Sequence, residues 1–245
     1  MSGFNFGRAG GTPPVVKNLI VINIIMFVAM LAFSQLFRIE LNRILGMYYI
    51  GSPLFKPWQI VTHMFMHGGF MHILFNMWAL WIFGKTLESV WGGKRFLIYY
   101  LVTGLGAVFF HQLVMYIELA PQIADFKATY NVDVLTVERL NHAMNSGSQF
   151  HGLIRGLVTP TVGASGAVFG ILLAFGMLFP NTPLFIIPFP FPIKAKWLVI
   201  GYGALELYLG VTQPGSNIAH FAHLGGMVFG FILIKYWHKT NNKFY

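Results

Sequence analysis

Residues 159–179 read TPTVGASGAVFGILLAFGMLF, an apolar stretch in which a serine stands among small residues. The 15 residues from Ser165 to Phe179 make about 22 Å of helix at 1.5 Å per residue. A bilayer core is about 30 Å thick, so a helix beginning at Ser165 starts below the membrane surface. Residues 159–163 are then non-helical backbone, which is tolerated at that depth only beside protein or water. We therefore expect a water-filled cavity with Ser165 at its floor.

The composition is typical of a membrane protein. Hydrophobic residues make up 56% of the 245-residue chain and charged residues 9%, whereas a soluble domain carries about 25% charged residues. The formal net charge is +9, but the Lys and Arg residues are scattered between apolar runs. These values exclude an ordinary soluble enzyme, a disordered tail and a nucleic-acid-binding domain. The chain has no cysteine, which excludes disulfides, thiolate metal sites and a cysteine nucleophile.

Six apolar segments are long enough to cross a bilayer, to within a few residues at each end. They are residues 19–37, 70–87, 96–116, 162–179, 197–211 and 218–237. Six spans place both termini on one side of the membrane, and that side carries 10 of the 16 Lys and Arg residues. Since basic residues favour the cytoplasmic side, both termini are expected there.

The domain organisation follows from these spans. We expect a flexible cytoplasmic tail at 1–15, a single six-helix domain at 16–238 and a short cytoplasmic tail at 239–245. Two long connections, 38–69 and 118–161, then lie on the extracytoplasmic side, where the cavity opens. The second connection has periodic apolar residues between charges, which indicates a short surface helix.

Two further polar clusters lie near the starts of other spans. His223 and the glycines at 226 and 230 share one face of the sixth span, where another backbone can approach closely. His72 and Asn76 share one face of the second span and could donate hydrogen bonds toward a common point. Each cluster alone is more often a packing device. The second, fourth and sixth spans start from the same side, however, so a serine, a histidine and a donor pair lie at similar depth, as acyl transfer requires.

The histidines also allow a metal site. The possible ligands are His63, His67 and His72 in one group, and His220 and His223 in another. A zincin-type H-E-x-x-H motif is absent from the sequence, and so is an aspartate within any span, which excludes a two-aspartate intramembrane protease. Glu88 and Glu206 are the acidic residues at or near a span, and neither has a partner suggesting paired-carboxylate chemistry. A transporter would need a second broken helix comparable to residues 159–163, and the sequence offers none.

The combined motifs resemble those of the rhomboid family of intramembrane serine proteases. The matching stretches are GASG at 163–166, A-H-x-x-G-x-x-x-G at 222–230, H-x-x-x-N at 72–76, HGGFMHILFN at 67–76, and G-x-x-x-E at 84–88 followed by Trp91-Gly92. They occur in the family's order, on its second, fourth and sixth helices, and the resemblance covers essentially all six spans. It implies an all-α membrane protein, a six-transmembrane-helix rhomboid-like bundle.

The resemblance also implies roles for individual residues. Ser165 is the expected nucleophile, and His223 is the general base and later the acid, in a dyad without a carboxylate. The Ser165 backbone N–H, His72 and Asn76 are expected to form the oxyanion hole. Supporting roles fall to Gly163, Gly166, Phe169, His67, Glu88, Gly226 and Gly230. Among these, Phe169 packs on the histidine without the hydroxyl that a tyrosine would bring, and Glu88 holds the first loop against the bundle.

One pair departs from the family's pattern. The first loop reads Trp58-Gln59, where relatives often have Trp-Arg. We expect this loop to lack a contact between a cation and backbone carbonyls, with altered stability or mobility as the result.

The expected function is that of an intramembrane serine endopeptidase, which hydrolyses a peptide bond in or next to the transmembrane segment of a membrane-protein substrate. Its partners are transmembrane substrates and the lipid bilayer, with no nucleic acid, and no metal or organic cofactor is implied. The expected location is the bacterial plasma membrane, with several passes. The alternative is a catalytically inactive rhomboid-like protein that binds membrane clients; retention of both Ser165 and His223 argues against it.

Overall fold

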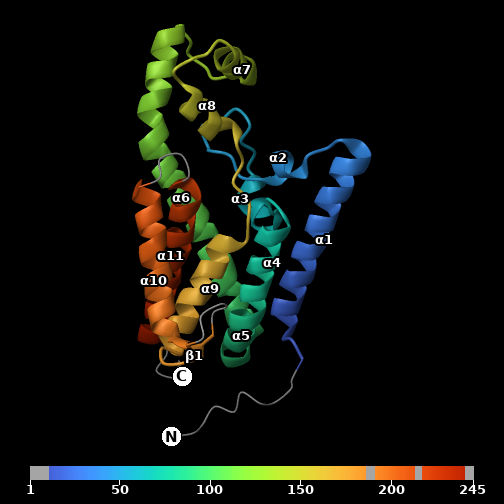
Figure 1. Cartoon of the computed structure of the whole chain (residues 1–245), viewed down its shortest axis with the longest axis vertical. Coiled ribbons are helices and arrows are strands. Elements are labelled where there is room, and N and C mark those ends of the chain that lie inside the picture. The colour runs from blue at the N-terminus through green and yellow to red at the C-terminus, as the bar shows by residue number, and fades with distance from the viewer. Residues whose placement is uncertain (1–10, 186–190, 213–216, 241–245) are drawn as a thin grey trace, which may run out of the picture.

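The long apolar helices run side by side in one bundle, with the short helices within residues 41–62 and 137–158 gathered toward one end (Figure 1). The computed structural model describes residues 11–185, 191–212 and 217–240. The α-helices are α1 (Pro14–Phe37), α2 (Leu41–Leu45), α3 (Gln59–Thr62), α4 (Phe70–Ala79), α5 (Lys85–Trp91), α6 (Gly93–Tyr130), α7 (Val137–Asn145), α8 (His151–Val158), α9 (Ser165–Leu178), α10 (Ala195–Thr212) and α11 (Asn217–Thr240). A 3₁₀ turn, η1 (His63–Phe65), follows α3, and a π-helical turn, η2 (Leu80–Gly84), joins α4 to α5. Strand β1 (Pro183–Leu184) pairs antiparallel with β2 (Ile193–Lys194).

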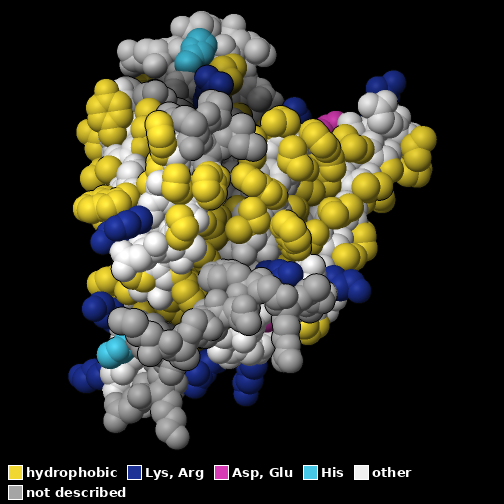
Figure 2. All heavy atoms as spheres, turned by 60° about the horizontal axis from the view of Figure 1, so that its bottom comes forward, with side chains coloured by type: hydrophobic (Ala, Val, Ile, Leu, Met, Phe, Trp, Pro, Cys, Tyr) yellow, Lys and Arg dark blue, Asp and Glu magenta, His cyan; other side chains and the backbone are white. Residues whose placement is uncertain are grey.

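The surface of the bundle is largely apolar. Hydrophobic side chains cover a broad zone of the face drawn in Figure 2, and charged side chains are sparse on it. Large apolar side chains stand exposed on the long helices, among them Ile25, Phe75, Trp78 and Phe109. Among the described residues, α1 and α6 are long and apolar enough to cross a membrane by themselves, while α9 is a shorter apolar helix of 14 residues. Such a surface is suited to lipid contact.

Helix α9 begins at Ser165, as its short apolar length predicts. The residues before it are non-helical and are bonded to the first loop. Met47 and Thr161 exchange two backbone hydrogen bonds of 2.8 Å, and the Gly163 N–H donates to the His63 carbonyl at 2.9 Å. Gly163 has φ +135°, and a Cβ at this position would lie 2.9 Å from the His72 ring. A glycine is therefore required where the chain turns into α9.

Glycines bring α9 close to its two main neighbours, α6 and α11. A Cβ on Gly226 of α11 would collide with the backbone carbonyl of Gly166 on α9. A Cβ on Gly170 would press on Thr103 of α6, 2.6 Å away. The Tyr99 hydroxyl on α6 donates to the Gly170 carbonyl at 2.8 Å. This close backbone packing sets the separation between the first turns of α9 and α11.

The structure changes two of the predicted boundaries. The third apolar segment was expected to end at 116, but α6 continues to Tyr130. Apolar residues continue at helical spacing beyond 116 and pack against α7 and α8 in a separate cluster, which includes Leu119, Phe126, Leu140, Leu153 and Leu157. The predicted tail at 1–15 is too long, because α1 already starts at Pro14, a residue suited to the first helical position. Residues 1–10 and 241–245 of the two predicted tails lie outside the described residues.

Candidate active site

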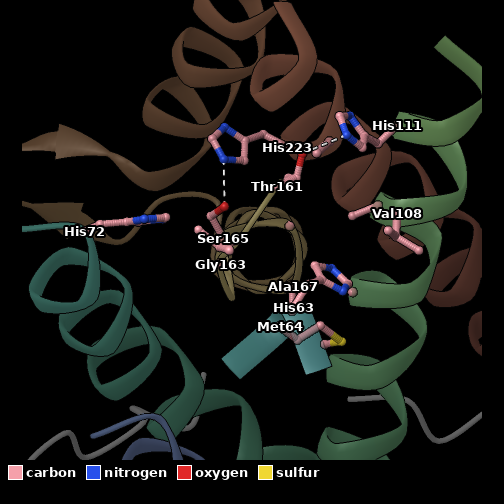
Figure 3. A pocket seen from close by; sticks show the side chains of 15 residues that line it. His63, Met64, His72, Val108, His111, Thr161, Gly163, Ser165, Ala167 and His223 are labelled. Carbon is pink, nitrogen blue, oxygen red and sulfur yellow. Dashed lines mark hydrogen bonds between the residues drawn. The ribbon is translucent and has the colours of Figure 1, made fainter. Parts of the chain in front are cut away.

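Ser165 and His223 meet where α9 and α11 are in contact. The Ser165 Oγ lies 2.8 Å from the His223 Nε2, although the two residues are 58 positions apart in the chain (Figure 3). When the ring proton is on Nδ1, the hydroxyl donates this hydrogen bond and Nε2 accepts it. The geometry is that of a hydroxyl nucleophile next to a general base.

The His223 ring is held on one face by Phe169. The two rings are stacked, with centroids 4.2 Å apart and planes within 5° of parallel. Phe169 lies one turn after Ser165 on α9, so the helix that carries the serine also supports the histidine. The predicted contact between Phe169 and the histidine is therefore present. At the same interface between α9 and α11, Gly226 and Gly166 form the close contact described above.

His72 on α4 points toward Ser165 and Gly163 (Figure 3). The Gly68 N–H donates to its Nδ1 at 3.3 Å, so the ring proton lies on Nε2. That nitrogen would be 2.9 Å from a Cβ on Gly163, which places the Nε2–H next to the turn that leads into Ser165. Asn76, one turn along, uses one amide N–H for the His72 carbonyl at 3.0 Å, and its second N–H is available to another acceptor.

Two hollows meet at Ser165. One is a small cavity of about 130 Å³ that is large enough for ordered water, and His63, His111 and Thr161 are among its polar lining residues. The Thr161 hydroxyl and the His111 Nε2 lie 3.0 Å apart in its wall. The other is a groove of about 580 Å³ between α4, α9 and α10. The apolar side chains that line the groove include Phe75, Trp78, Phe83, Phe169, Leu172, Leu198 and Tyr202, and His72, Asn76, Ser165 and His223 reach into it.

A buried carboxylate lies on the other side of His223. Glu206 on α10 is 8% exposed, and its Oε2 lies 2.6 Å from the Nδ1 of His220 and 3.1 Å from the Nδ1 of His223. The sequence did not pair Glu206 with another carboxylate, and its partners in the structure are two imidazoles. The contact between Glu206 and His220 could have been predicted from their spacing, because they are 14 residues apart on consecutive predicted spans. In an antiparallel pair of helices, residues equidistant from the connection lie at the same depth.

Among the described residues, Glu206, His220 and His223 form a group that could hold a metal ion. Each offers one ligand atom, and these atoms lie within 4.8 Å of one another. The other predicted group, His63, His67 and His72, does not bring three ligand atoms together in the described part of the chain.

His63 and His67 are buried below the site. Burial lowers the pKa of each imidazole to about 4, so both are neutral at physiological pH. The His63 Nδ1 donates to the Gln59 carbonyl at 2.9 Å. The His67 ring packs edge-on against His72, with centroids 5.1 Å apart. Both residues therefore support the turn that carries the site.

The contacts of Glu88 correct one expectation from the sequence, and those of Gln59 add to another. Glu88 does not hold the first loop: its two carboxylate oxygens accept the backbone N–H groups of Val15 and Val16, at 3.0 and 2.7 Å, where α1 begins. Gln59, by contrast, is neutral, as the expected lack of a cation contact assumed, but it still bonds to backbone carbonyls. Its buried amide donates to the carbonyls of Ile44 and Leu54, at 3.2 and 3.3 Å. A neutral amide thus makes the contacts that were expected of a cation.

Comparisons with known proteins show which family the chain resembles. A family model described as the rhomboid domain matches residues 54–120 and 124–240. The chain is 25% identical over 233 residues to the rhomboid protease AarA of Providencia stuartii, covering 91% of this chain and 72% of that protein. It is 25% identical over 188 residues to the putative rhomboid protease YdcA of Bacillus subtilis, covering 76% and 70%.

Mitochondrial proteins are also among the relatives. The chain is 28% identical over 185 residues to the mitochondrial rhomboid protein 1 of Saccharomyces cerevisiae, covering 76% of this chain and 43% of the yeast protein. It matches 55% of the mitochondrial RHOMBOID-like protein 12 of Arabidopsis thaliana. The chain therefore spans about half the length of these mitochondrial relatives.

Proposed function

The chain belongs to the rhomboid family, and from this premise we propose that it is an intramembrane serine endopeptidase whose nucleophile is Ser165 and whose general base is His223. Membership makes it an integral membrane protein with an all-α membrane fold. The observation that carries the proposal is the 2.8 Å contact between the Ser165 Oγ and the His223 Nε2, at the meeting point of a small cavity and an apolar groove.

The acylation step uses groups already in place. His223 takes the hydroxyl proton as the Ser165 Oγ attacks the scissile carbonyl carbon, and the carbonyl oxygen becomes an oxyanion. Three donors can face that oxygen: the His72 Nε2–H, the second N–H of Asn76, and the backbone N–H of Ser165, which has no partner within its own helix. His223 then gives its proton to the departing amine, leaving an acyl-enzyme.

Water completes the reaction. A water molecule from the cavity attacks the acyl carbon, and His223 accepts its proton before returning one to the Ser165 oxygen.

The groove supports a transmembrane substrate. Its walls are apolar side chains of α4, α9 and α10, which fit a lipid-embedded segment. A helix hides its carbonyls in internal hydrogen bonds, so the segment must unwind to expose one, and helix-breaking or small residues near the cut favour this. We place the protein across the membrane with six spans: α1, α4 to α5, α6, α9, α10 and α11. The bias of basic residues favours both termini in the cytoplasm, with the cavity open to the opposite side. The bacterial plasma membrane is the location that we propose, and the bacterial relatives support it.

The test compares detergent-solubilised wild type with Ser165→Ala and His223→Ala. The readouts are labelling by a fluorescent phosphonate and cleavage of a single-span reporter protein. Ser89→Ala is the matched control, because the Ser89 hydroxyl donates to the Lys85 carbonyl of its own helix, away from the site. We expect each site variant to lose at least about 10³-fold in cleavage rate and the control to stay active.

Two results would contradict the proposal. Labelling that survives in Ser165→Ala would mean that another residue is the nucleophile. A folded wild type that neither labels nor cleaves would favour the inactive, client-binding alternative.

A further inference from the structure

The environment of the His223 Nδ1 is unusual for a histidine that is expected to work in a dyad. This nitrogen is buried and has no hydrogen-bond partner, yet it lies 3.1 Å from the Glu206 Oε2. The two atoms are in contact without being aligned for a hydrogen bond. The Nε2 on the opposite side of the ring bonds to Ser165. The imidazole therefore lies between the serine hydroxyl and a carboxylate, which α9 and α10 supply from either side of α11.

We propose that Glu206 is a positioning residue for His223, so that the reaction runs through a serine, histidine and glutamate in series. This inference rests on the proposed function and concerns how its base works. The resemblance implied a base without a carboxylate.

The chemistry of the first step explains what the carboxylate does. When Ser165 attacks, its hydroxyl proton moves to Nε2 and the new bond forms between Oγ and the carbonyl carbon. The Nδ1 proton stays on the ring, which becomes an imidazolium. The imidazolium then lies beside the negative Oε2, which is 3.1 Å from Nδ1, and the two opposite charges attract across a contact that little water can screen. Glu206 stays ionised throughout, so it stabilises the charged intermediate without taking a proton.

His220 keeps the carboxylate in this place. Its Nδ1 lies 2.6 Å from the same Oε2, one helical turn from His223 on α11. As a neutral imidazole it donates its Nδ1–H to that oxygen and orients it toward α11. The other titratable group that faces His223 is His72 on α4. Glu206 is the acidic side chain that reaches this cluster among the described ion pairs.

Two other roles for the cluster make different predictions. If Glu206 only ties α10 to α11 through His220, losing either residue should have the same effect on stability and activity. If the three side chains bind a metal ion, wild-type activity should follow the metal supply.

The experiment measures kcat and KM for reporter cleavage, and the phosphonate labelling rate, in wild type, Glu206→Gln, Glu206→Asp and His220→Gln. We expect Glu206→Gln to lower kcat at least 10-fold, with KM and the unfolding midpoint nearly unchanged, because glutamine keeps the volume and removes the charge. The labelling rate should fall by the same factor. Glu206→Asp keeps the charge and should retain at least three times the kcat of Glu206→Gln. His220→Gln can still donate to Oε2 and should lose less than 3-fold.

Several results would overturn the assignment. A kcat in Glu206→Gln equal to that of wild type would overturn it. So would a kcat in Glu206→Asp no higher than that in Glu206→Gln. Equal loss of activity and stability in Glu206→Gln and His220→Gln would show a structural tie instead. Activity that a chelator removes and Zn²⁺ restores would show a metal site. These outcomes leave the proposed function standing, whereas a folded wild type that neither labels nor cleaves overturns both.

Discussion

The two buried carboxylates of this protein, Glu88 and Glu206, differ in the kind of partner each one has. Their exposed fractions are similar, 3% and 8%. Glu88 accepts two backbone N–H groups at the start of α1, donors that cannot titrate and that carry the positive end of the helix dipole. Glu206 faces two imidazoles, whose charge can change within a reaction cycle. Burial alone therefore does not assign a role to a carboxylate, whereas the chemistry of its partner does.

The largest effect is expected at the contact between α9 and α11, which sets the separation between Ser165 and His223. A Cβ at Gly226 would collide with the Gly166 carbonyl, which is backbone and cannot rotate away. Gly226→Ala should push α11 from α9 and lower kcat/KM for reporter cleavage by at least about 100-fold, as misplacement of a catalytic group does.

The control for this change is Gly201→Ala on α10, because a Cβ at Gly201 meets nothing within 4 Å. It should remain within about twofold of wild type, as surface substitutions away from special features do. Wild-type activity in Gly226→Ala would mean that the contact between α9 and α11 does not position His223. Glu206 and His220 would then be sufficient to hold the histidine in place.

Acid is expected to destabilise the protein through the buried histidines near Ser165, His63 and His67. The folded pKa of His63 and of His67 is about 4, against about 6.5 in an unfolded chain. Below pH 6.5 the unfolded chain takes up protons that the folded chain does not, so stability is full above pH 6.5 and is lost as the pH falls toward 4. Each histidine contributes up to about 3 kcal/mol to this loss.

Thermal unfolding in detergent between pH 7.5 and 4.5 measures this effect. His67→Phe keeps a ring of similar shape and removes one titrating group, so its unfolding midpoint should fall less steeply with acid than that of wild type. An unfolding midpoint that does not change with pH in wild type would show that these two imidazoles are not held neutral.

Glu88→Gln tests whether Glu88, unlike Glu206, serves stability and not activity. Loss of the charge weakens two hydrogen bonds to the start of α1, and we expect the free energy of unfolding to fall by about 2 kcal/mol. Activity per folded molecule should stay within about twofold of wild type, since the carboxylate of Glu88 bonds to the start of α1 and not to the residues of the site. The paired measurement is Glu206→Gln, for which the opposite pattern is expected. If both variants lose activity at unchanged stability, the distinction between the two carboxylates fails.

The smallest effect is expected at Phe169, which supports the His223 ring face to face at 4.2 Å. Phe169→Leu keeps an apolar side chain but loses the flat stacking surface, and should lower kcat about threefold, as loss of about 0.5–1.5 kcal/mol of ring contact implies. Phe109→Leu is the matched control, because Phe109 packs on Phe229 and is exposed on the outer face. Equal kcat in the two variants would mean that stacking does not help to position the base.

Sequence periodicity predicted the segments of the bundle better than their ends. The start of α9 at Ser165 was predictable because the apolar run is too short to cross the membrane. The end of α6 was not predictable from hydropathy, because polar residues after 116 interrupt the apolar run while Leu119 and Phe126 keep the helical spacing. Those side chains are buried only because α7 and α8 fold back over them.

The sequence by itself determined which reactive side chains exist and which helix ends carry them: Ser165, His223, His72 and Asn76 could all be named from motif and spacing. Tertiary structure alone decided the partners of Glu88, Glu206 and Gln59. The physical reason is that a membrane helix is apolar on nearly every face, so hydropathy does not encode its rotation or depth. Those two quantities, set by the packing of glycine-lined helices, determine which buried polar groups meet.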